Sequence, residues 1–490
     1  MKKNKLIPLL LAALLAVGAV ASSCRKRDPG KEEPTGTTGG SEQTSGLYVA
    51  DYLPDTTYNN SDFRILTLPD DYANMYTGFL ADSSSADKVI AARYKRNSMI
   101  EEKYKIKFVE ELAKSWEECS SMLESYAGSG DDAYELNMLI QREAFVLAID
   151  GYCVTTADLK YNDLTQPWYV HDVNDMLRVN KIYYFAYSAE CLNMFAQTNC
   201  VFYNIDKGKG ISLEDPYSDV KNGTWTFDKM LTYAKAATRD LDNDGTITDN
   251  DSVGMNGRGD MVHPTLWIGA GYRTMDKNSD DYPIFTAAGD EKFIDFLTVL
   301  SDNVKTGVIF DTTKYPSQKW PSEEHTARAI NAFIDGTSLF HVASIGTTFR
   351  LNGMEHEFRI LPAPKSSEEQ EAYRSRVVDG WLYVVPSSNT HLDMTSVILE
   401  VLAVESANHV YDAYYEEALG NRYARDGENK EMLDLISKTR YLELGDTVWQ
   451  ADIRNSILVA IWDGNNTFSS LLNSKAALIE LLIAKYLNAL

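Results

Sequence analysis

Twelve residues near the middle of the chain combine oxygen-bearing side chains with the spacing of a cation-binding loop. The residues that could supply ligands are Asp240, Asp242, Asp244, Thr246, Thr248 and Asp251. Calcium takes about six to eight oxygen ligands, and alternate carboxylates converge on it where a glycine, here Gly245, allows a sharp turn. The spacing matches an EF-hand loop, except that Asp stands at the last position, where Glu is usual. The loop therefore predicts a structural calcium ion.

The same loop has a second interpretation, in which the aspartates only accept hydrogen bonds from nearby backbone N–H groups. Three converging carboxylates would repel one another without a cation, which favours calcium. The residues after the loop, Ser252 to Met255, do not begin a helix, and the sequence holds no second copy of the loop. Neither a calcium-sensor pair nor a dockerin is therefore predicted.

The first residues of the chain have the pattern of an export signal. Lys2, Lys3 and Lys5 precede an apolar run from residue 6 to residue 20, and small residues lead into Cys24. A Cys at this place is typical of a bacterial lipobox, so residues 1–23 are predicted to be a signal peptide and Cys24 to carry lipid. Ordinary signal cleavage with release of the protein is the alternative. An apolar run of about 15 residues is too short to span a bilayer, so the predicted membrane contact is a lipid anchor on the outer face.

The stretch after Cys24 is predicted to be a flexible tether. Residues 25–46 contain almost no apolar side chains, and we place the end of the tether at residue 60. About 440 residues follow residue 46, which is more than one core usually supports, so two lobes are expected. Removing the three signal lysines takes the formal net charge from −24 to −27. A surface this acidic disfavours nucleic acid and anionic lipid as partners.

Four cysteines follow the predicted lipid site: Cys119, Cys153, Cys191 and Cys200. Their spacings do not resemble a zinc site, and four cysteines in a chain this long do not form a disulfide scaffold. A disulfide between Cys191 and Cys200 and buried free thiols both stay open.

Short strand patterns alternate with helical patterns after residue 60. Residues 63–67, 105–110 and 135–140 are expected to be strands, with helices at 88–104 and 115–126. Strands separated by single helices form parallel sheets, and ligands bind beyond the carboxyl ends of such strands. Gln141 and Arg142 directly follow the third strand, so we expect them at the binding edge. Further along, we expect strands at 181–187, 201–204, 358–361 and 381–385, and helices at 227–237, 394–419 and 468–490.

Several local segments, taken in their order along the chain, resemble a known family. They are Tyr203-Asn204, the Trp-Thr element within residues 223–228, the Phe-x-x-Gly turn at 333–336, and Leu361-Pro362-Ala363-Pro364-Lys365 as a crossing strand. Together with the export signal they resemble the extracellular solute-binding proteins of ABC transporters, the family that includes maltose-binding protein. The resemblance covers about residues 60–490. It implies an α/β, two-lobe periplasmic-binding-protein-like type II fold with hinge strands between lobes. The first lobe is placed at 61–190 plus 362–405, and the second, with the calcium loop, at 191–361 plus 406–490.

The resemblance also implies a function, which is to capture a solute between the lobes and deliver it to an ABC transporter permease. We expect the receptor to be a monomer and its ligand to be a carbohydrate, with an oligosaccharide favoured. A peptide or another small polar solute is the alternative ligand. The ligand-binding residues that the resemblance implies are Gln141, Arg142, Glu190, Trp267, Ser344, Asp379 and Trp381. Tryptophan rings stack on sugar faces, and 8 Trp and 29 Tyr in the chain fit such a ligand.

Two other classes compete with this interpretation. A surface glycoside hydrolase is also exported, acidic and rich in aromatic residues, and it needs two carboxylates facing each other across the bond that it cleaves. The sequence contains no HExxH, GxSxG or P-loop signature, and no local motif nominates such a carboxylate pair. An adhesion or sensing lipoprotein without transport is the third class. The sequence favours a binding protein that is not an enzyme.

Overall fold

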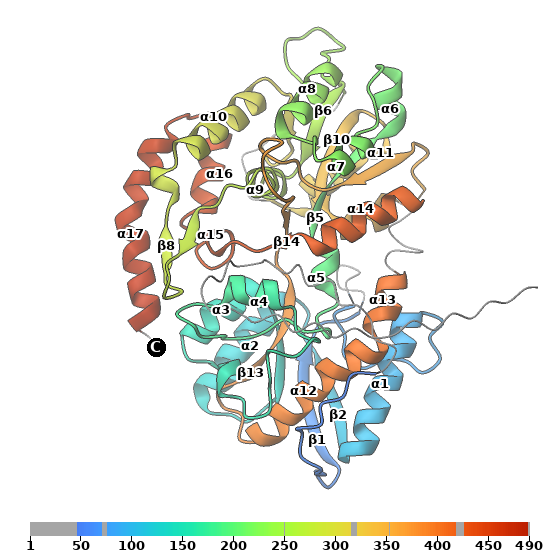
Figure 1. Ribbon diagram of the computed structural model, residues 1–490, viewed down its shortest axis with the longest axis vertical. Coiled ribbons are helices and arrows are strands. Elements are labelled where there is room, and N and C mark those ends of the chain that lie inside the picture. The colour runs from blue at the N-terminus through green and yellow to red at the C-terminus, as the bar shows by residue number, and fades with distance from the viewer. Residues whose placement is uncertain are drawn as a thin grey trace, which may run out of the picture. The chain divides into compact units, whose positions relative to one another are not determined.

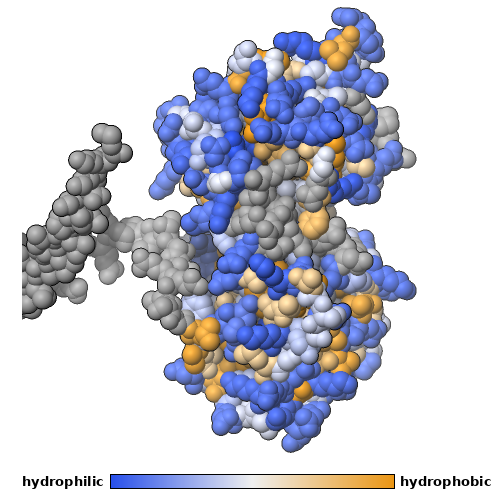
Figure 2. Space-filling view, turned by 90° about the vertical axis from the view of Figure 1, so that its right-hand side faces the viewer, coloured by the Kyte–Doolittle hydropathy of each residue, from blue (hydrophilic) through white to orange (hydrophobic). Residues whose placement is uncertain are grey.

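The computed structural model describes residues 47–70, 76–248, 250–314, 321–351, 353–417 and 426–488 (Figure 1). The predicted signal peptide and Cys24 lie outside these residues. In the described part, no helix is both long and apolar enough to cross a membrane. Hydrophilic residues predominate on the face drawn in Figure 2, with apolar residues in small groups between them, as the acidic composition leads one to expect.

The first sheet forms as the alternating pattern predicts. Its strands are β1 (Ser61–Thr67), β2 (Ile106–Leu112), β3 (Leu136–Ile140), β4 (Cys153–Val154) and β13 (Trp381–Pro386), in the order β2-β1-β3-β13-β4. The strands β2, β1 and β3 run parallel, and β13 is antiparallel to β3. The helices α1 (Lys88–Tyr104), α2 (Trp116–Ser129) and α3 (Gln141–Ile149) pack on these strands, and α12 (Leu392–His409) packs on α1. We call this sheet and its helices the first lobe.

A second sheet, built from the middle of the chain, defines the second lobe. Its strands are β5 (Asn199–Asn204), β6 (Val253–Gly257), β9 (Ile309–Asp311), β10 (Ser338–Ser344) and β11 (Phe358–Leu361), in the order β11-β5-β10-β6-β9. The strands β10, β6 and β9 run parallel, and β5 is antiparallel to both of its neighbours. Packed on this sheet are α8 (Phe227–Ala237), α9 (Gly259–Gly269), α10 (Glu291–Lys305), α11 (Glu323–Ile334) and α14 (Gly427–Lys438).

Shorter elements and the C-terminal helices complete the described part. The helices are α4 (His171–Leu177), α5 (Asn193–Ala196), α6 (Ile205–Gly210), α7 (Tyr217–Asn222), α13 (Tyr411–Glu417), α15 (Leu444–Thr447), α16 (Arg454–Trp462) and α17 (Phe468–Asn488). The strands β7 (Met275–Lys277) and β8 (Pro283–Phe285) form a hairpin, and β12 (Ser375–Arg376) pairs with β14 (Arg440–Tyr441).

Local sequence sets where the long helices begin. Asp87 accepts hydrogen bonds from the N–H groups of Val89 and Ile90 at the start of α1. The N-cap Thr226 accepts a hydrogen bond from Lys229 N at the start of α8. Such caps satisfy backbone donors that the first turn leaves without partners, and each stabilises its helix by about 1 kcal/mol.

The structure places the return crossing between the lobes later than the sequence predicts. Lys365 pairs with Thr226 inside the second lobe, where its N–H donates to Trp225 O. The chain therefore stays with the second lobe beyond residues 361–365, and it crosses at 377–381, where Val378 N donates to Gln197 O. Similarly, α13 packs on α1 of the first lobe, so the chain is still in that lobe after residue 406.

Two further sequence expectations differ from the structure. Residues 181–187 do not form a regular strand, because Asn180 and Lys181 adopt left-handed backbone conformations that an extended run does not tolerate. The tether was expected to reach residue 60, but Tyr48 already exchanges two hydrogen bonds with Asn408 of α12, and Tyr52 donates to Glu400. Cys191 and Cys200, like Cys119 and Cys153, are free thiols.

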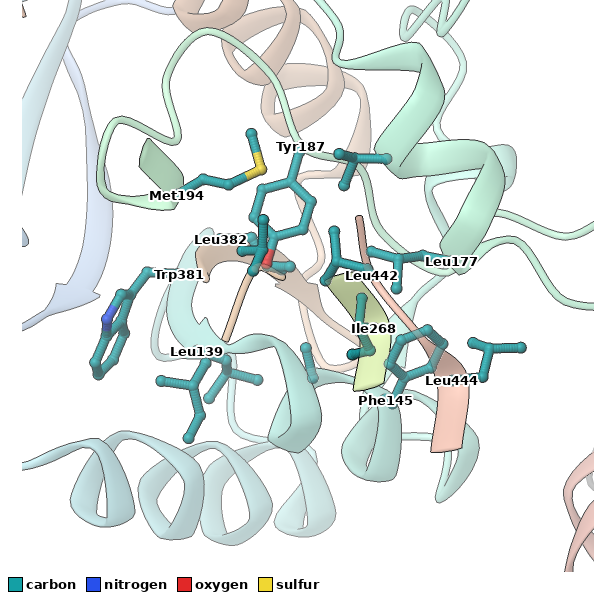
Figure 3. Close-up of a cluster of buried hydrophobic side chains, with 14 of the residues drawn as sticks. Leu139, Phe145, Leu177, Tyr187, Met194, Ile268, Trp381, Leu382, Leu442 and Leu444 are labelled. Carbon is teal, nitrogen blue, oxygen red and sulfur yellow. The ribbon is translucent and has the colours of Figure 1, made fainter. Parts of the chain in front are cut away.

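An apolar cluster joins the two lobes beside the crossing (Figure 3). Phe145, Leu177 and Tyr187 of the first lobe gather with Ile268 of α9 and with Leu442 and Leu444, which follow β14. Each of these side chains is at most 5% exposed. Burial of one such side chain contributes roughly 1.5–3 kcal/mol, so the cluster stabilises the contact between the lobes.

Glu443, within the same region, gives a test of this packing. Its carboxylate accepts from Thr274 Oγ1 at 2.9 Å and from Met275 N at 2.8 Å. Burial, reinforced by the neighbouring Asp446, raises the pKa of Glu443 from 4.5 to about 7. The folded state therefore holds this proton more tightly than the unfolded chain, and the protein loses stability as pH rises from 4.5 to about 7.

We expect Glu443→Gln, which stays neutral, to remove this part of the pH dependence. The melting temperature of the variant minus that of the wild type should become more positive as pH is raised from about 5 to about 8. Thermal unfolding followed by circular dichroism measures the difference, with the exposed Glu124→Gln as control. Parallel melting curves for the wild type and Glu443→Gln across this pH range would contradict the assignment.

Candidate ligand-binding site

The predicted binding edge of the first sheet carries a paired charge on an aromatic platform. Arg142 follows β3 directly, and its guanidinium forms an ion pair with the Asp379 carboxylate. The same guanidinium lies over the Trp116 ring, 4.7 Å from the ring centre. Asp379 precedes the antiparallel strand β13, so it reaches the same edge as Arg142, and Gln141 N donates to Gly380 O at 2.9 Å to fix the register.

The corresponding edge of the second sheet carries a similar pair. Arg258 follows β6, and its Nε and Nη2 donate to the two carboxylate oxygens of Asp260 at 3.0 and 2.7 Å. Burial lowers the pKa of Arg258, but the carboxylates of Asp260 and Asp379 raise it by more than burial lowers it. The pKa of Arg258 therefore lies above its ordinary value. The negative charge of Asp379 thus acts on cations from both lobes.

A buried network behind this second edge holds it in place. Arg376, which is fully buried, donates to both oxygens of Asp446 at 2.6 and 2.9 Å and to the carbonyl of Asp260 at 3.1 Å. Arg454 lies 3.6 Å from the same Asp446 carboxylate. Cations and carboxylates alternate through the network, so each charge has a neighbour of opposite sign.

The structure brings part of the predicted ligand set together. Gln141, Arg142, Asp379 and Trp381 all lie where β3 ends and β13 begins. Trp381 is 3% exposed, and its backbone N–H donates to Asn193 Oδ1 at 2.9 Å. Gln141 is buried, and its Nε2 has no hydrogen-bond partner among the described residues. Ser344 ends β10 on the second sheet, where it pairs with Asn199 and is half-buried.

Two predicted residues are engaged elsewhere in this conformation. Glu190 forms a buried ion pair with Arg96 and accepts a hydrogen bond from Ser406. Trp267 has no exposed surface, and its ring packs edge-on against Phe293, with the ring centres 6.0 Å apart. A ring without exposed surface cannot stack on a sugar, and the Glu190 carboxylate already has its partners, so we do not carry Trp267 and Glu190 forward as ligand contacts. Trp381, at 3% exposed, likewise does not offer its ring as a stacking surface in this conformation.

Sequence reasoning missed Trp116, Arg258 and Asp260. Trp116 opens the helix after β2, and Arg258 and Asp260 follow β6, so the rule that found Arg142 applies to all three. The strand before Arg258 reads Val-Gly-Met-Asn-Gly, which lacks the β-branched alternation that would have marked it.

The acidic loop brings three of its predicted ligands together. Carboxylate oxygens of Asp240, Asp242 and Asp244 lie within 4.8 Å of one another. Asp240 is held by hydrogen bonds from Asn243 N and Gly245 N, and Gly245 adopts the left-handed conformation that the sharp turn requires. The loop is therefore folded so that several carboxylate oxygens converge.

The far end of the loop is arranged differently from the prediction. Asp251 is buried, and its two oxygens accept hydrogen bonds from Leu241 N and from Thr248 N and Oγ1. Asp251 and Thr248, which were predicted as ligands, thus hydrogen-bond to each other, and Asp251 also ties the end of the loop to its start at Leu241. Thr246, whose backbone carbonyl is the ligand expected at this loop position, donates its N–H to the Asp244 carboxylate. Asp249, inside the loop, lies outside the described residues.

The chain matches no protein-family model and no curated protein. Among solved structures, the chain is similar to the ABC substrate-binding protein Lmo0181 from Listeria monocytogenes in complex with cycloalternan, with 13% sequence identity and a TM-score of 0.55. The match covers 88% of this chain and 100% of the Lmo0181 chain. A cyclo/maltodextrin-binding protein complexed with maltotetraose is similar at 9% identity and 0.57, covering 86% and 97%. UgpB from Mycobacterium tuberculosis, in complex with glycerophosphocholine, is similar at 14% identity and 0.54, covering 86% and 98%.

At these identities the likeness shows the fold. The chain has the two-lobe α/β fold of these solute-binding proteins, as the sequence predicts. Two of the three similar proteins are named as binding proteins, and the ligand in each of the three complexes is a property of that protein.

Proposed function

We propose that the protein is the ligand-capturing receptor of an ABC importer and binds a carbohydrate, best an oligosaccharide, between its lobes. The observation that carries this proposal is the Arg142–Asp379 pair on the Trp116 ring, which lies at the edge where ligands of such sheets bind. The similar structures, which include complexes with cycloalternan and maltotetraose, support the same class of ligand.

The chemistry of the edge fits an uncharged polyol. A guanidinium donates hydrogen bonds and a carboxylate accepts them, so an Arg–Asp pair serves both sides of a hydroxyl group. The part of Trp116 that stays exposed would pack against the apolar face of a sugar ring. Arg142 and Arg258 are each paired with a carboxylate, so these described pairs offer no excess charge to an anion. This balance favours a neutral ligand.

The pairing of Asp260 with Arg258 argues against Asp260 as the acid of a glycoside hydrolase, whereas burial raises the pKa of Glu143, the neighbour of Arg142. Glycoside cleavage needs a carboxylic acid that keeps its proton near neutral pH, which requires a raised pKa. Burial raises the pKa of Asp260, but Arg258 lowers it more, and the pKa lies below its ordinary value. Asp260 is therefore a poor general acid. Product formation from an oligosaccharide would instead favour a surface glycoside hydrolase, and binding without an associated permease would favour an adhesion or sensing lipoprotein.

The remaining parts of the proposal rest on the sequence. The export pattern before Cys24 supports a protein held on the outer face of the cell membrane by lipid on Cys24, next to the permease that it would serve, and we propose that it acts there as a monomer. Mass spectrometry of the membrane-derived protein, with Cys24→Ser as the comparison, distinguishes lipid attachment from release by ordinary cleavage.

Arg142→Gln and Asp379→Asn should each weaken binding of a neutral oligosaccharide about tenfold or more, because each removes a hydrogen-bonding group that carries charge. A thermal-shift panel of neutral oligosaccharides, acidic oligosaccharides and peptides identifies the ligand, and isothermal calorimetry gives its affinity. Lys221→Gln, at an exposed ion pair away from the edge, is the matched control. Unchanged affinity in both Arg142→Gln and Asp379→Asn would refute the placement of the site.

We also propose that the 240–251 loop binds structural calcium. The support is the convergence of Asp240, Asp242 and Asp244, whose like charges a divalent cation would neutralise.

Calcium at millimolar concentration should raise the melting temperature above that in chelator, since a cation that binds the folded state alone stabilises it. Asp240→Asn combined with Asp242→Asn should abolish that rise. Magnesium serves as the ionic-strength control, and the exposed Asp295→Asn serves as the control variant. Identical melting temperatures of the wild type with calcium and with chelator would rule the site out.

A further inference from the structure

The β7–β8 hairpin of the second lobe extends to the first lobe (Figure 1). Its base is fixed within the second lobe, because Glu443 holds Met275 and α17 packs on β8. Its turn is held by hydrogen bonds of its own, since Asn278 Oδ1 accepts from Asp280 N and Tyr282 N, at 2.9 and 3.0 Å. The hairpin thus projects as a preformed unit.

One contact at the tip is made by Asp281 to the turn that follows α4. Its carboxylate accepts from Arg178 Nε at 2.9 Å and from Lys181 N at 3.1 Å, and its carbonyl accepts from Asn180 N at 3.0 Å. Asp281 is 9% exposed. Asn180, Lys181 and Asp281 all have positive φ, so the two turns meet in backbone conformations that residues other than glycine seldom adopt.

A second contact is made by Lys277 to the end of α4. Its ammonium donates to the carbonyls of Asp175, at 2.9 Å, and Arg178. These carbonyls lie where the helix ends, and a cation there is favoured by the helix dipole. The same ammonium lies 3.3 Å from the Asp281 carboxylate, so the two hairpin charges also stabilise each other.

These contacts are chemically complementary in both directions. The hairpin offers a cation to carbonyl groups of the first lobe and an anion to N–H groups and a guanidinium of the first lobe. The hairpin lies far along the chain both from the first crossing, which leads through α5 into β5, and from the return crossing at 377–381. Its contacts with the 178–181 segment therefore form a link between the lobes that the continuity of the chain does not require. Any movement that separates α4 from the hairpin must break them together.

We propose that Lys277 and Asp281 of the hairpin, with Arg178 and the 180–181 turn, form a latch that limits how far the two lobes separate. The latch is an interaction within the folded chain and needs no ligand. Its use in setting ligand affinity rests on the proposed function, because a lobe equilibrium matters for binding only if the ligand lies between the lobes.

The test uses the ligand-free protein, so it is independent of the carbohydrate proposal. Asp281→Asn keeps the size and the left-handed conformation of the residue and removes its charge. Lys277→Met keeps the apolar stem and removes the ammonium. Asp276→Asn is the matched control, because Asp276 lies in the same hairpin and pairs with Arg273 within the second lobe.

For Asp281→Asn and for the double variant with Lys277→Met, we expect amide hydrogen exchange to become about tenfold faster at residues 172–181. The amide of Leu442, which contacts Met176 across the lobes, should exchange faster as well. The radius of gyration from solution scattering should increase, whereas Asp276→Asn should behave as the wild type. Circular dichroism establishes that each variant is folded, and the single Asp281→Asn substitution serves if the double variant is not.

The outcomes separate a latch from a local anchor. Faster exchange confined to the hairpin, with Leu442 and the radius of gyration unchanged, would overturn the proposal and leave only a local role. Unchanged exchange in both lobes would overturn it too. Failure of every carbohydrate to bind would affect the proposed function and would leave these measurements interpretable.

Discussion

A guanidinium without access to water organises the junction between the two sheets. Arg376 donates to both oxygens of Asp446 and to the Asp260 carbonyl. Removing one partner of such a buried pair leaves an uncompensated charge, at a cost of about 3–5 kcal/mol. The start of α9, the strand β12 and the helix α15 are therefore held in one arrangement. Because the crossing begins directly after Arg376, this pair also sets where the chain leaves the second lobe.

The binding edge inherits its geometry from that junction. Asp260 stands at the start of α9, and Asp379 stands three residues after Arg376, so both carboxylates are positioned by the same buried network. Their arginine partners come from different sheets. Under the proposed function, a ligand at this edge would meet groups whose charges are already matched, so hydroxyl geometry and ring shape, more than net charge, would decide what fits.

Regular elements were the most predictable part of the structure. The helix at 88–104 has the predicted bounds, because its apolar spacing and its N-cap Asp87 both place the start of the helix at residue 88. Short-range patterns also fixed the first three strands of the first sheet to within two residues. The strand expected at 181–187 failed because two left-handed residues precede and begin it, and backbone conformation of that kind is not visible in a hydrophobic pattern.

The residues of the candidate site could be predicted only where the order of the strands brings those residues together. Arg142 and Asp379 meet because one follows β3 and the other precedes β13. Glu190 was assigned by resemblance, yet its partner Arg96 lies 94 residues earlier in the chain, on α1. Long-range pairs of this kind depend on packing between elements, and a single sequence does not encode them in any local signal.

The four free thiols have a consequence for how the chain matures. Cys119, Cys153 and Cys200 are buried, and burial raises the pKa of Cys119 to about 12 and that of Cys200 well above its ordinary value. Thiol–disulfide exchange proceeds through the thiolate, which these positions suppress. The described fold depends on packing and hydrogen bonds without a covalent cross-link. Suppression of the thiolate therefore slows disulfide formation by these buried cysteines even where oxidant is present.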